Sequence, residues 1–265
     1  MATVGIIFHP QRPHAVELAD TLMAELKAGG HDARLPTDAA SASGLDLAVS
    51  LGGDGTMLRT VDLVAATGVP ILGVNVGHLG YLTEVDGEDA VGAVERFLAG
   101  DYRIESRMTL AVGVSGAEHH AFNEAVVEKT VSGHTIRVAV SIDGRPFTTY
   151  AADGLIVATP TGSTAYSLSA HGPIVSPTHR GMILTPVSPH MLFARSLVLG
   201  PDETVQLAVI SGPPAVLVVD GSQRAELGVG DVVSCRAGDH DVNLVTFGQR
   251  DFHGILKRKF GLADR

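Results

Sequence analysis

A glycine-rich turn near residue 54 constrains this chain more than any other feature. Residues 52–56 are Gly-Gly-Asp-Gly-Thr, after an apolar run at 45–51 that predicts a strand and before a run at 56–67 that predicts a helix. Glycines at a strand-to-helix turn let backbone N–H groups approach a phosphate where a Cβ atom would clash. The residues that we predict to bind phosphate are Gly52, Gly53, Gly55 and Thr56.

A single carboxylate stands in the middle of this turn. Asp54 is out of place in a simple anion site, because its charge repels phosphate. The residue makes sense if it accepts a proton or faces a phosphate that carries a metal ion. We therefore predict a phosphotransferase whose catalytic carboxylate is Asp54, and the sequence leaves a metal-orienting role open as the alternative.

Strands and helices alternate through the first hundred residues. The pattern predicts strands at residues 4–8, 32–35, 45–51 and 70–75, and helices at 14–28, 56–67 and 90–98. This alternation is typical of an open, mostly parallel sheet with helices on its faces, so we predict an α/β domain over residues 1–104. Ligands of such sheets bind beyond the carboxyl ends of the strands, where Asp54 and the loop after Asn75 would lie.

After residue 104 the pattern changes to short strands without a long helix. Apolar and β-branched runs predict strands at 109–114, 137–142, 145–150, 217–219, 232–236 and 242–247. Asp-Gly pairs at 143–144 and 220–221 predict tight hairpin turns. We expect an all-β, sandwich-like domain over residues 105–247. We also expect a C-terminal tail, residues 248–265, whose helix at 252–260 returns to the first domain.

The composition excludes several classes of partner. The 265 residues carry a formal net charge of -10 and, apart from Lys-Arg-Lys at 257–259, no run of basic residues, so we expect no nucleic-acid partner. No apolar run reaches the ~18 residues of a membrane span, and the N-terminus lacks the basic region of a signal peptide. The single cysteine, Cys235, rules out an internal disulfide and fits a reducing cytoplasm. We expect a cytoplasmic protein without a membrane partner, which holds any anionic substrate through N–H groups, arginines or a metal ion.

Two further segments carry polar groups suited to a nucleotide. Residues 153–166 run from an aspartate across a strand to a hydroxyl-rich turn. These hydroxyls suit sugar or phosphate oxygens and Tyr166 suits stacking on a base, but an ordinary turn after a strand explains the same pattern. An adjacent pair, Asn123 and Glu124, precedes another strand, where surface polar residues are also common. No His-x-x-x-His pair with a glutamate occurs, so we name no metal-ligating residue.

Four segments, in this order, resemble the NAD kinase family: residues 52–56, residues 75–82 (Asn-Val-Gly-His-Leu-Gly-Tyr-Leu), the Asn-Glu pair at 123–124, and residues 153–166. The resemblance covers nearly the whole chain, including the Asp-Gly hairpin and the closing basic segment. The Gly-Gly-Asp-Gly-Thr turn alone is less specific, since lipid and sphingoid kinases share it. The Thr-Gly-Ser-Thr-Ala-Tyr run, together with the Asn-Glu pair, is much more specific.

The resemblance implies a kinase that transfers a phosphoryl group from ATP, or from polyphosphate, to the 2′-hydroxyl of the adenosine ribose of NAD, giving NADP. It implies Asp54 as general base, a divalent metal ion such as Mg²⁺, and a homodimer or homotetramer. The β-rich domain would bind NAD, with Asn123 and Glu124 at the adenine side and Asp153 at the nicotinamide end. The substrate-binding positions implied in this way are Asp54, Gly55, Arg59, Tyr81, Asn123, Glu124, His134, Asp153, Thr164, Ala165, Tyr166, Ser169 and Gln223.

Two other functions stay open. A lipid or sphingoid-base kinase would share the turn, but it would need an apolar channel or a membrane-facing patch, and the sequence shows no basic amphipathic helix. A non-enzymatic dinucleotide-binding regulator would have little use for Asp54, and the Gly-x-Gly-x-x-Gly fingerprint is missing at the first strand. Formation of NADP from NAD, ATP and magnesium separates the three functions.

Overall fold

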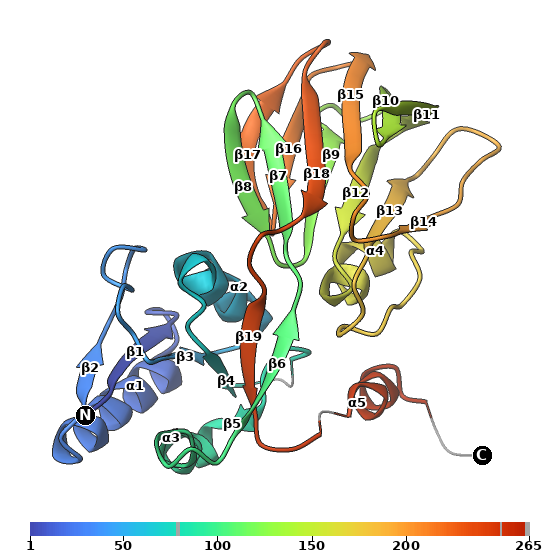
Figure 1. Cartoon of the computed structure of the whole chain (residues 1–265). Coiled ribbons are helices and arrows are strands. Elements are labelled where there is room, and N and C mark those ends of the chain that lie inside the picture. Colours follow the sequence, from blue (N-terminus) through green and yellow to red (C-terminus); the bar gives the residue numbers. More distant parts are fainter. Residues whose placement is uncertain (78–79, 250, 263–265) are drawn as a thin grey trace. The chain divides into compact units, whose positions relative to one another are not determined.

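The computed structural model describes residues 1–77, 80–249 and 251–262 (Figure 1). His78 and Leu79, which belong to the run at 75–82, therefore lie outside the described residues. The chain divides into two compact units. The first holds Met1–Ser106 and Val242–Arg265, and the second holds Arg107–Asp241. The second unit is thus inserted into the sequence of the first.

The first unit is built on a seven-stranded sheet. Its strands are β1 (Thr3–Phe8), β2 (Asp32–Arg34), β3 (Leu47–Leu51), β4 (Ile71–Asn75), β5 (Val85–Asp86), β6 (Arg103–Arg107) and β19 (Val242–Thr246). Their order is β2-β1-β3-β4-β19-β6, with β5 beside β4. The pairs of β1 with β2 and β3 are parallel, as are those of β4 with β3, β5 and β19. The predicted open, mostly parallel sheet is confirmed.

Helices accompany this sheet. They are α1 (Pro13–Ala28), α2 (Asp54–Val64), α3 (Ala90–Leu98) and α5 (Phe252–Lys259), with short 3-10 turns η1 (Ala65–Thr67) and η2 (Gly87–Asp89). Helix α1 opens on a proline, which lacks the N–H that a first turn leaves without a partner. Leu22 and Leu26 of α1 share a buried core with Val94 and Phe97 of α3. Helix α5 belongs to the first unit, which confirms the predicted return of the C-terminal helix.

Strand β19 corrects one prediction. We placed residues 242–247 in the β-rich domain, but β19 pairs with β4 in the first sheet, with Leu244 opposite Ile71. The Asn243 side chain donates to the Gly68 carbonyl at 3.2 Å, and Val245 lies in the core of the first unit. A short apolar strand fits any sheet with an open edge, so its pattern does not say which sheet it joins.

The second unit is an all-β sandwich. Its strands are β7 (Leu110–Val114), β8 (Ala117–Ala121), β9 (Glu124–Lys129), β10 (Ile136–Ile142), β11 (Arg145–Ala152), β12 (Gly154–Ala158), β13 (Met182–Val187), β14 (Leu197–Leu199), β15 (Val205–Ser211), β16 (Ala215–Val219), β17 (Ser222–Leu227) and β18 (Val232–Ala237). They form two six-stranded sheets, β11-β10-β15-β18-β7-β8 and β14-β13-β12-β9-β16-β17. One apolar core draws Leu110 and Val138 from one sheet and Leu155 and Leu217 from the other. The sandwich-like fold is confirmed.

Both Asp-Gly pairs form the predicted hairpin turns. Asp143 and Gly144 join β10 to β11 with φ values of 49° and 71°, and Asp220 and Gly221 join β16 to β17 with values of 46° and 77°. Positive φ at both central residues matches the right-handed twist of the strands, and Asp tolerates this conformation better than most residues. Between strands β12 and β13 lie the short elements η3 (Thr161–Thr164) and α4 (Tyr166–Ser169).

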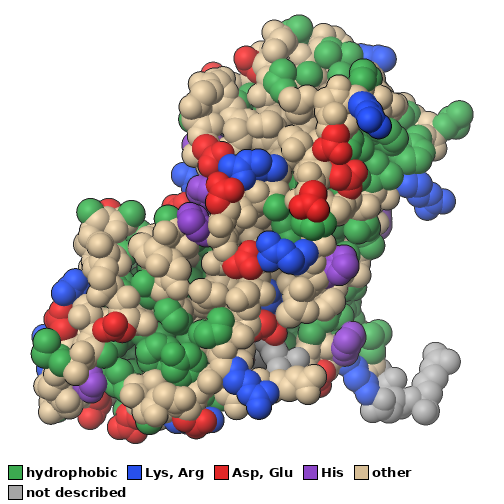
Figure 2. Space-filling view, viewed as in Figure 1, with side chains coloured by type: hydrophobic (Ala, Val, Ile, Leu, Met, Phe, Trp, Pro, Cys, Tyr) green, Lys and Arg blue, Asp and Glu red, His purple; other side chains and the backbone are tan. Residues whose placement is uncertain are grey.

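Charged side chains of both signs are interspersed over the described part of the face in Figure 2. Some form local ion pairs. Arg236 contacts Asp239 at 2.7 Å and Glu118 at 3.1 Å, and Arg180 contacts Asp241 at 2.7 Å. Within the described ranges, no helix combines the length and the apolar character that crossing a membrane requires.

Candidate functional site

The glycine turn of the first unit leaves room at its surface. Strand β3 ends at Leu51, and helix α2 begins at Asp54. A Cβ atom on Gly52 would lie 2.2 Å from Thr56 Oγ1, so the fold itself requires glycine there. Cβ atoms on Gly53 and Gly55 would meet nothing within 4 Å. The fold does not require glycine at these two positions, which leaves space for a bound group beside the start of a helix.

The carboxylate of Asp54 is held by the backbone of Tyr81 and Leu82. Its Oδ1 accepts the N–H groups of Tyr81 and Leu82, each at 3.0 Å, and its Oδ2 accepts that of Tyr81 at 3.1 Å. A Cβ atom on Gly80 would lie 2.4 Å from Asp54 Oδ1, so a larger residue at that position would displace the Asp54 carboxylate. A carboxylate has about four acceptor sites, so Oδ2 keeps capacity for one further donor.

Two predicted residues accompany Asp54 in the first unit. The Tyr81 ring carries the ammonium of Lys259 at 4.4 Å from its centroid. Burial, and then the charge of Asp54, raise the pKa of the Tyr81 hydroxyl. Arg59 is exposed on α2, beyond the first turn. Lys259 lies in α5, so the C-terminal helix contributes a cation beside Tyr81, whose N–H holds Asp54. The sequence did not predict this contact.

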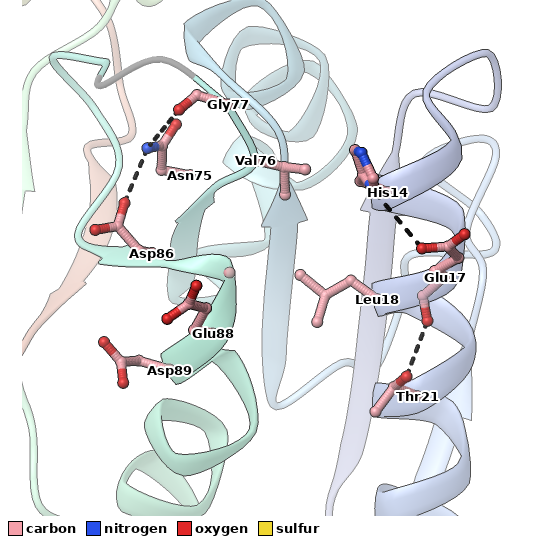
Figure 3. A pocket seen from close by; sticks show the side chains of 11 residues that line it. His14, Glu17, Leu18, Thr21, Asn75, Val76, Gly77, Asp86, Glu88 and Asp89 are labelled. Carbon is pink, nitrogen blue, oxygen red and sulfur yellow. Dashed lines mark hydrogen bonds and ion pairs between the residues drawn. The ribbon is translucent and has the colours of Figure 1, made fainter.

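A hollow of about 780 Å³ lies near the end of β4 (Figure 3). Four carboxylates line it: Glu17, Asp86, Glu88 and Asp89. The Asn75 side chain donates to Asp86 at 2.9 Å, and its buried carbonyl oxygen has no partner among the described residues. Because carboxylates repel phosphate, this hollow suits phosphate groups less well than the glycine turn does.

In the second unit, Asn123 and Glu124 stand at the start of β9. Their backbone N–H groups donate to Asp220 Oδ1 at 2.8 Å and 3.0 Å. Glu124 is 8% exposed, and its Oε2 has no partner within the described part of the chain. Burial, and then the charge of Asp220, raise the pKa of Glu124 to about 8. The carboxyl group therefore holds its proton near neutral pH and can donate a hydrogen bond to a ligand.

The hydroxyl-rich turn packs directly on the Asn-Glu pair. The backbone N–H of Thr159 donates to the Asn123 carbonyl at 2.8 Å. A Cβ atom on Gly162 would lie 2.1 Å from the same carbonyl oxygen, so only glycine allows this approach. The Thr164 hydroxyl donates to the Thr161 carbonyl at 3.3 Å, and the Ala165 N–H to the Gly162 carbonyl at 2.9 Å. The structure thus brings residues 123–124 and 159–165 together.

Tyr166 connects this turn to Asp153. Burial raises the pKa of its hydroxyl, followed by the charges of Glu128, Asp153 and Glu124. Asp153 itself pairs with the Lys129 ammonium at 2.6 Å. Asp153 is therefore neutralised by a cation that the sequence analysis did not single out, and no spacing between the two residues could have indicated the pair.

The remaining predicted residues of the second unit are more exposed. Tyr166 and Ser169 line a cavity of about 780 Å³ together with Arg195. His134 lies in the exposed loop between β9 and β10, and Gln223 is exposed on β17, after the Asp220 turn. Tyr166, Ser169 and Gln223 are thus connected to the Asn-Glu region by packing or by chain neighbourhood, whereas His134 stands apart on its loop.

Comparison with known proteins decides the family. A family model described as the ATP-NAD kinase N-terminal domain matches residues 24–102, and one described as the ATP-NAD kinase C-terminal domain matches residues 122–247. An NAD kinase of Heliobacterium modesticaldum is 43% identical, with 98% of both chains covered. The chain belongs to the NAD kinase family. An NAD kinase of Symbiobacterium thermophilum is 38% identical, with 98% of this chain and 99% of the relative covered.

Solved structures agree with membership of the NAD kinase family. Yeast NADH kinase, solved in complex with NADH, matches with a TM-score of 0.87 at 26% identity, over 100% of this chain and 89% of that one. An NAD kinase from Archaeoglobus fulgidus, solved in complex with ATP, shares the fold with a TM-score of 0.80 at 24% identity, over 98% and 100% of the two chains. The predicted fold class and the expectation of a kinase in the NAD kinase family are confirmed.

Proposed function

We propose that this chain phosphorylates the 2′-hydroxyl of the adenosine ribose of NAD, with ATP as the donor and Asp54 as the general base. One observation carries the proposal: a carboxylate fixed by two backbone N–H groups lies beside two glycines that leave open space at a helix start. The names of the family models and of the curated relatives supply the donor and the acceptor.

The geometry suits removal of a proton from an alcohol. A secondary hydroxyl is a poor nucleophile until its proton begins to leave, and a carboxylate within hydrogen-bond reach accepts that proton. The N–H groups of Tyr81 and Leu82 fix the orientation of Asp54 while Oδ2 keeps capacity for a donor. The open side of Gly53 and Gly55 then accommodates the donor phosphates, so positioning and charge neutralisation supply most of the remaining rate.

The acceptor side fits the second unit. Glu124 carries a proton near neutral pH, so it donates to an acceptor such as a ring nitrogen, while Asn123 offers an amide beside it. Tyr166 and Ser169 line a cavity with room for part of a dinucleotide. Yeast NADH kinase, which has this fold, was solved with the reduced dinucleotide bound, and this supports dinucleotide binding by the present chain.

A divalent ion such as Mg²⁺ fits the proposed reaction as a partner of the donor. Mg²⁺ is usually held by substrate phosphates and one or two carboxylates rather than by a cage of side chains. Among the described residues, no group of three His, Cys, Asp or Glu side chains could hold a metal ion. Asp54 is the carboxylate of the glycine turn that would help to hold the ion, and the ion would neutralise charge on the donor phosphates. Polyphosphate is the alternative donor, and a cytoplasmic homodimer or homotetramer is the form that we propose.

The activity is tested by incubating the protein with NAD, ATP and Mg²⁺ and measuring NADP. NADP formation is expected. Phosphate appearing on a lipid instead supports a lipid-type kinase, and binding of NAD without turnover supports a dinucleotide-binding regulator. Replacing ATP with polyphosphate in the same assay decides the donor.

The role of Asp54 is tested with Asp54→Asn. Loss of a general base lowers turnover by about 10²- to 10⁴-fold, while NAD affinity should be kept, because the amide fills the same volume. Asp62→Asn is the matched control, since Asp62 is exposed on the same helix. Near-normal turnover in Asp54→Asn would exclude Asp54 as the base.

A further inference from the structure

The segment that carries Asn123 and Glu124 is held by a residue outside the predicted site. Asp220 Oδ2 accepts the N–H of Phe122 at 2.7 Å, while Oδ1 accepts those of Asn123 and Glu124 at 2.8 Å and 3.0 Å. The backbone N–H of Asp220 in turn donates to the Glu124 carbonyl at 3.1 Å. A single residue of the β16–β17 turn thus fixes three consecutive peptide units that lie 96 to 98 positions away in the sequence.

Thr159 holds the same segment from the β12 side. Its N–H donates to the Asn123 carbonyl at 2.8 Å, and its hydroxyl donates to the Phe122 carbonyl at 2.6 Å. The hydroxyl also accepts the N–H of Gly162 at 3.0 Å. The N–H groups of residues 122–124 are therefore bound on one side and the carbonyls of Phe122 and Asn123 on the other, which leaves this backbone little freedom.

The hydrogen bonds and the backbone conformation at position 220 favour a carboxylate side chain. Asp220 has a φ of 46°, a conformation that Asp and Asn tolerate better than most residues. An ionised carboxylate accepts hydrogen bonds on both of its oxygens. An asparagine side chain accepts them only on its oxygen and donates through its NH₂ group. In the equivalent turn of the other hairpin, Asp143 has a φ of 49°, and its carboxylate accepts the Thr204 N–H at 2.9 Å.

We infer that Asp220 is a positioning residue of the acceptor site: together with Thr159 it fixes the backbone of residues 122–124, so that Asn123 and Glu124 meet the dinucleotide in one orientation. The inference rests on the proposed function, in which Asn123 and Glu124 bind NAD. It extends that function to a residue that acts through its neighbours.

Asp220 also affects the protonation of Glu124. Burial raises the pKa of Glu124 most, the charge of the Asp220 carboxylate raises it further, and a hydrogen bond from the backbone N–H of Tyr166 lowers it. Burial, and then the charges of Glu128, Asp153 and Glu124, raise the pKa of the Tyr166 hydroxyl. Replacing Asp220 with a neutral side chain removes the repulsion, so the pKa of Glu124 falls. The pH midpoint of NAD binding then moves to lower pH, whichever form of Glu124 binds NAD.

The test compares Asp220→Asn with Asp143→Asn, which makes the same change in the same type of turn. The dissociation constant of NAD is measured by calorimetry between about pH 6 and pH 9. This range spans the pKa of Glu124, about 8, so both protonation states are sampled. Asp220→Asn should weaken NAD binding at least about tenfold and shift the pH midpoint downward. Asp143→Asn should leave both unchanged. Wild-type affinity and an unmoved midpoint in Asp220→Asn would overturn the inference.

Folding is followed by circular dichroism and thermal unfolding of each variant. If Asp220→Asn does not fold, Thr159→Val replaces it, because this change removes the hydroxyl that holds the Phe122 carbonyl while keeping the shape of the side chain. Unchanged NAD affinity in Thr159→Val would then overturn the inference. If the wild-type protein itself does not bind NAD, the proposed function fails first. If the wild type binds NAD and Asp220→Asn binds it equally well, only the inference about Asp220 fails.

Discussion

Gly55→Ala should stabilise the protein and impair the donor site at the same time. Gly55 lies in the first turn of α2, and a Cβ atom there would meet nothing within 4 Å. Alanine is favoured over glycine in a helix by about 0.5–1 kcal/mol, so the free energy of unfolding should rise by up to that amount. The corresponding rise in Tm is about 2–4 °C per kcal/mol for a chain of this size class.

The added methyl group projects into the space that we assign to the donor phosphates. A steric conflict of this kind costs about 1–3 kcal/mol, which lowers kcat/KM for ATP about 5- to 150-fold. The measurement is NADP formation against ATP concentration at saturating NAD, beside thermal unfolding of the same samples. Because the change adds one carbon and no charge, KM for NAD should stay near the wild-type value.

Gly92→Ala is the matched control for Gly55→Ala. Gly92 lies in α3, and a Cβ atom there also meets nothing within 4 Å. It should give a similar gain in stability without any change in kcat/KM. Wild-type kcat/KM for ATP in Gly55→Ala would refute the assignment of this turn to the donor phosphates. A loss of stability in Gly55→Ala would refute the open space that the structure shows.

Three further predictions concern the loop that holds Asp54 in the first unit and the Asn123–Glu124 segment in the second unit. Gly80→Ala places a methyl group against Asp54 Oδ1, within 2.4 Å, so kcat should fall while NAD affinity stays unchanged; an unaltered kcat would contradict this. Gly162→Ala forces the turn away from the Asn123 carbonyl and should destabilise the second unit by about 1–3 kcal/mol in urea unfolding, which a wild-type midpoint would disprove. The folded-state pKa of Glu124, about 8 against an ordinary 4.5, means that the folded protein binds this proton more tightly than the unfolded chain. Stability should therefore fall as the pH rises from about 4.5 through about 8, and Glu124→Gln should flatten this fall; equal pH profiles for the two proteins would exclude it.

Local pattern was enough to predict much of the fold. The strand, turn and helix around Asp54 were predicted from apolar runs whose spacing changes from strand-like to helical across three glycines. Each of the two hairpin turns was predicted from its Asp-Gly pair alone. These features depend on neighbours in sequence, so they are visible without tertiary information. The resemblance to the NAD kinase family then added Asn123 and Glu124 to the predicted substrate-binding residues. Without that resemblance, a polar pair before a strand is weak evidence for a binding site.

Long-range contacts account for what the sequence analysis missed. Three such contacts join residues that are far apart in the chain. They are the hydrogen bonds of Asp220 to residues 122–124, the ion pair of Lys129 with Asp153, and the Lys259 ammonium over the Tyr81 ring. None of them leaves a periodic signal. The misplaced strand at 242–247 has the same cause, since apolar alternation predicts a strand but not its partner.

The position of β19 has a consequence for how the protein is made. This strand is inserted between β4 and β6, yet it follows β6 by more than a hundred residues. During synthesis the place between β4 and β6 stays empty until the whole second unit has left the ribosome. For that period the edges of β4 and β6 offer unpaired N–H and carbonyl groups to other chains. Premature termination near residue 240 would therefore damage the N-terminal sheet, although every residue of β1 to β6 had been made.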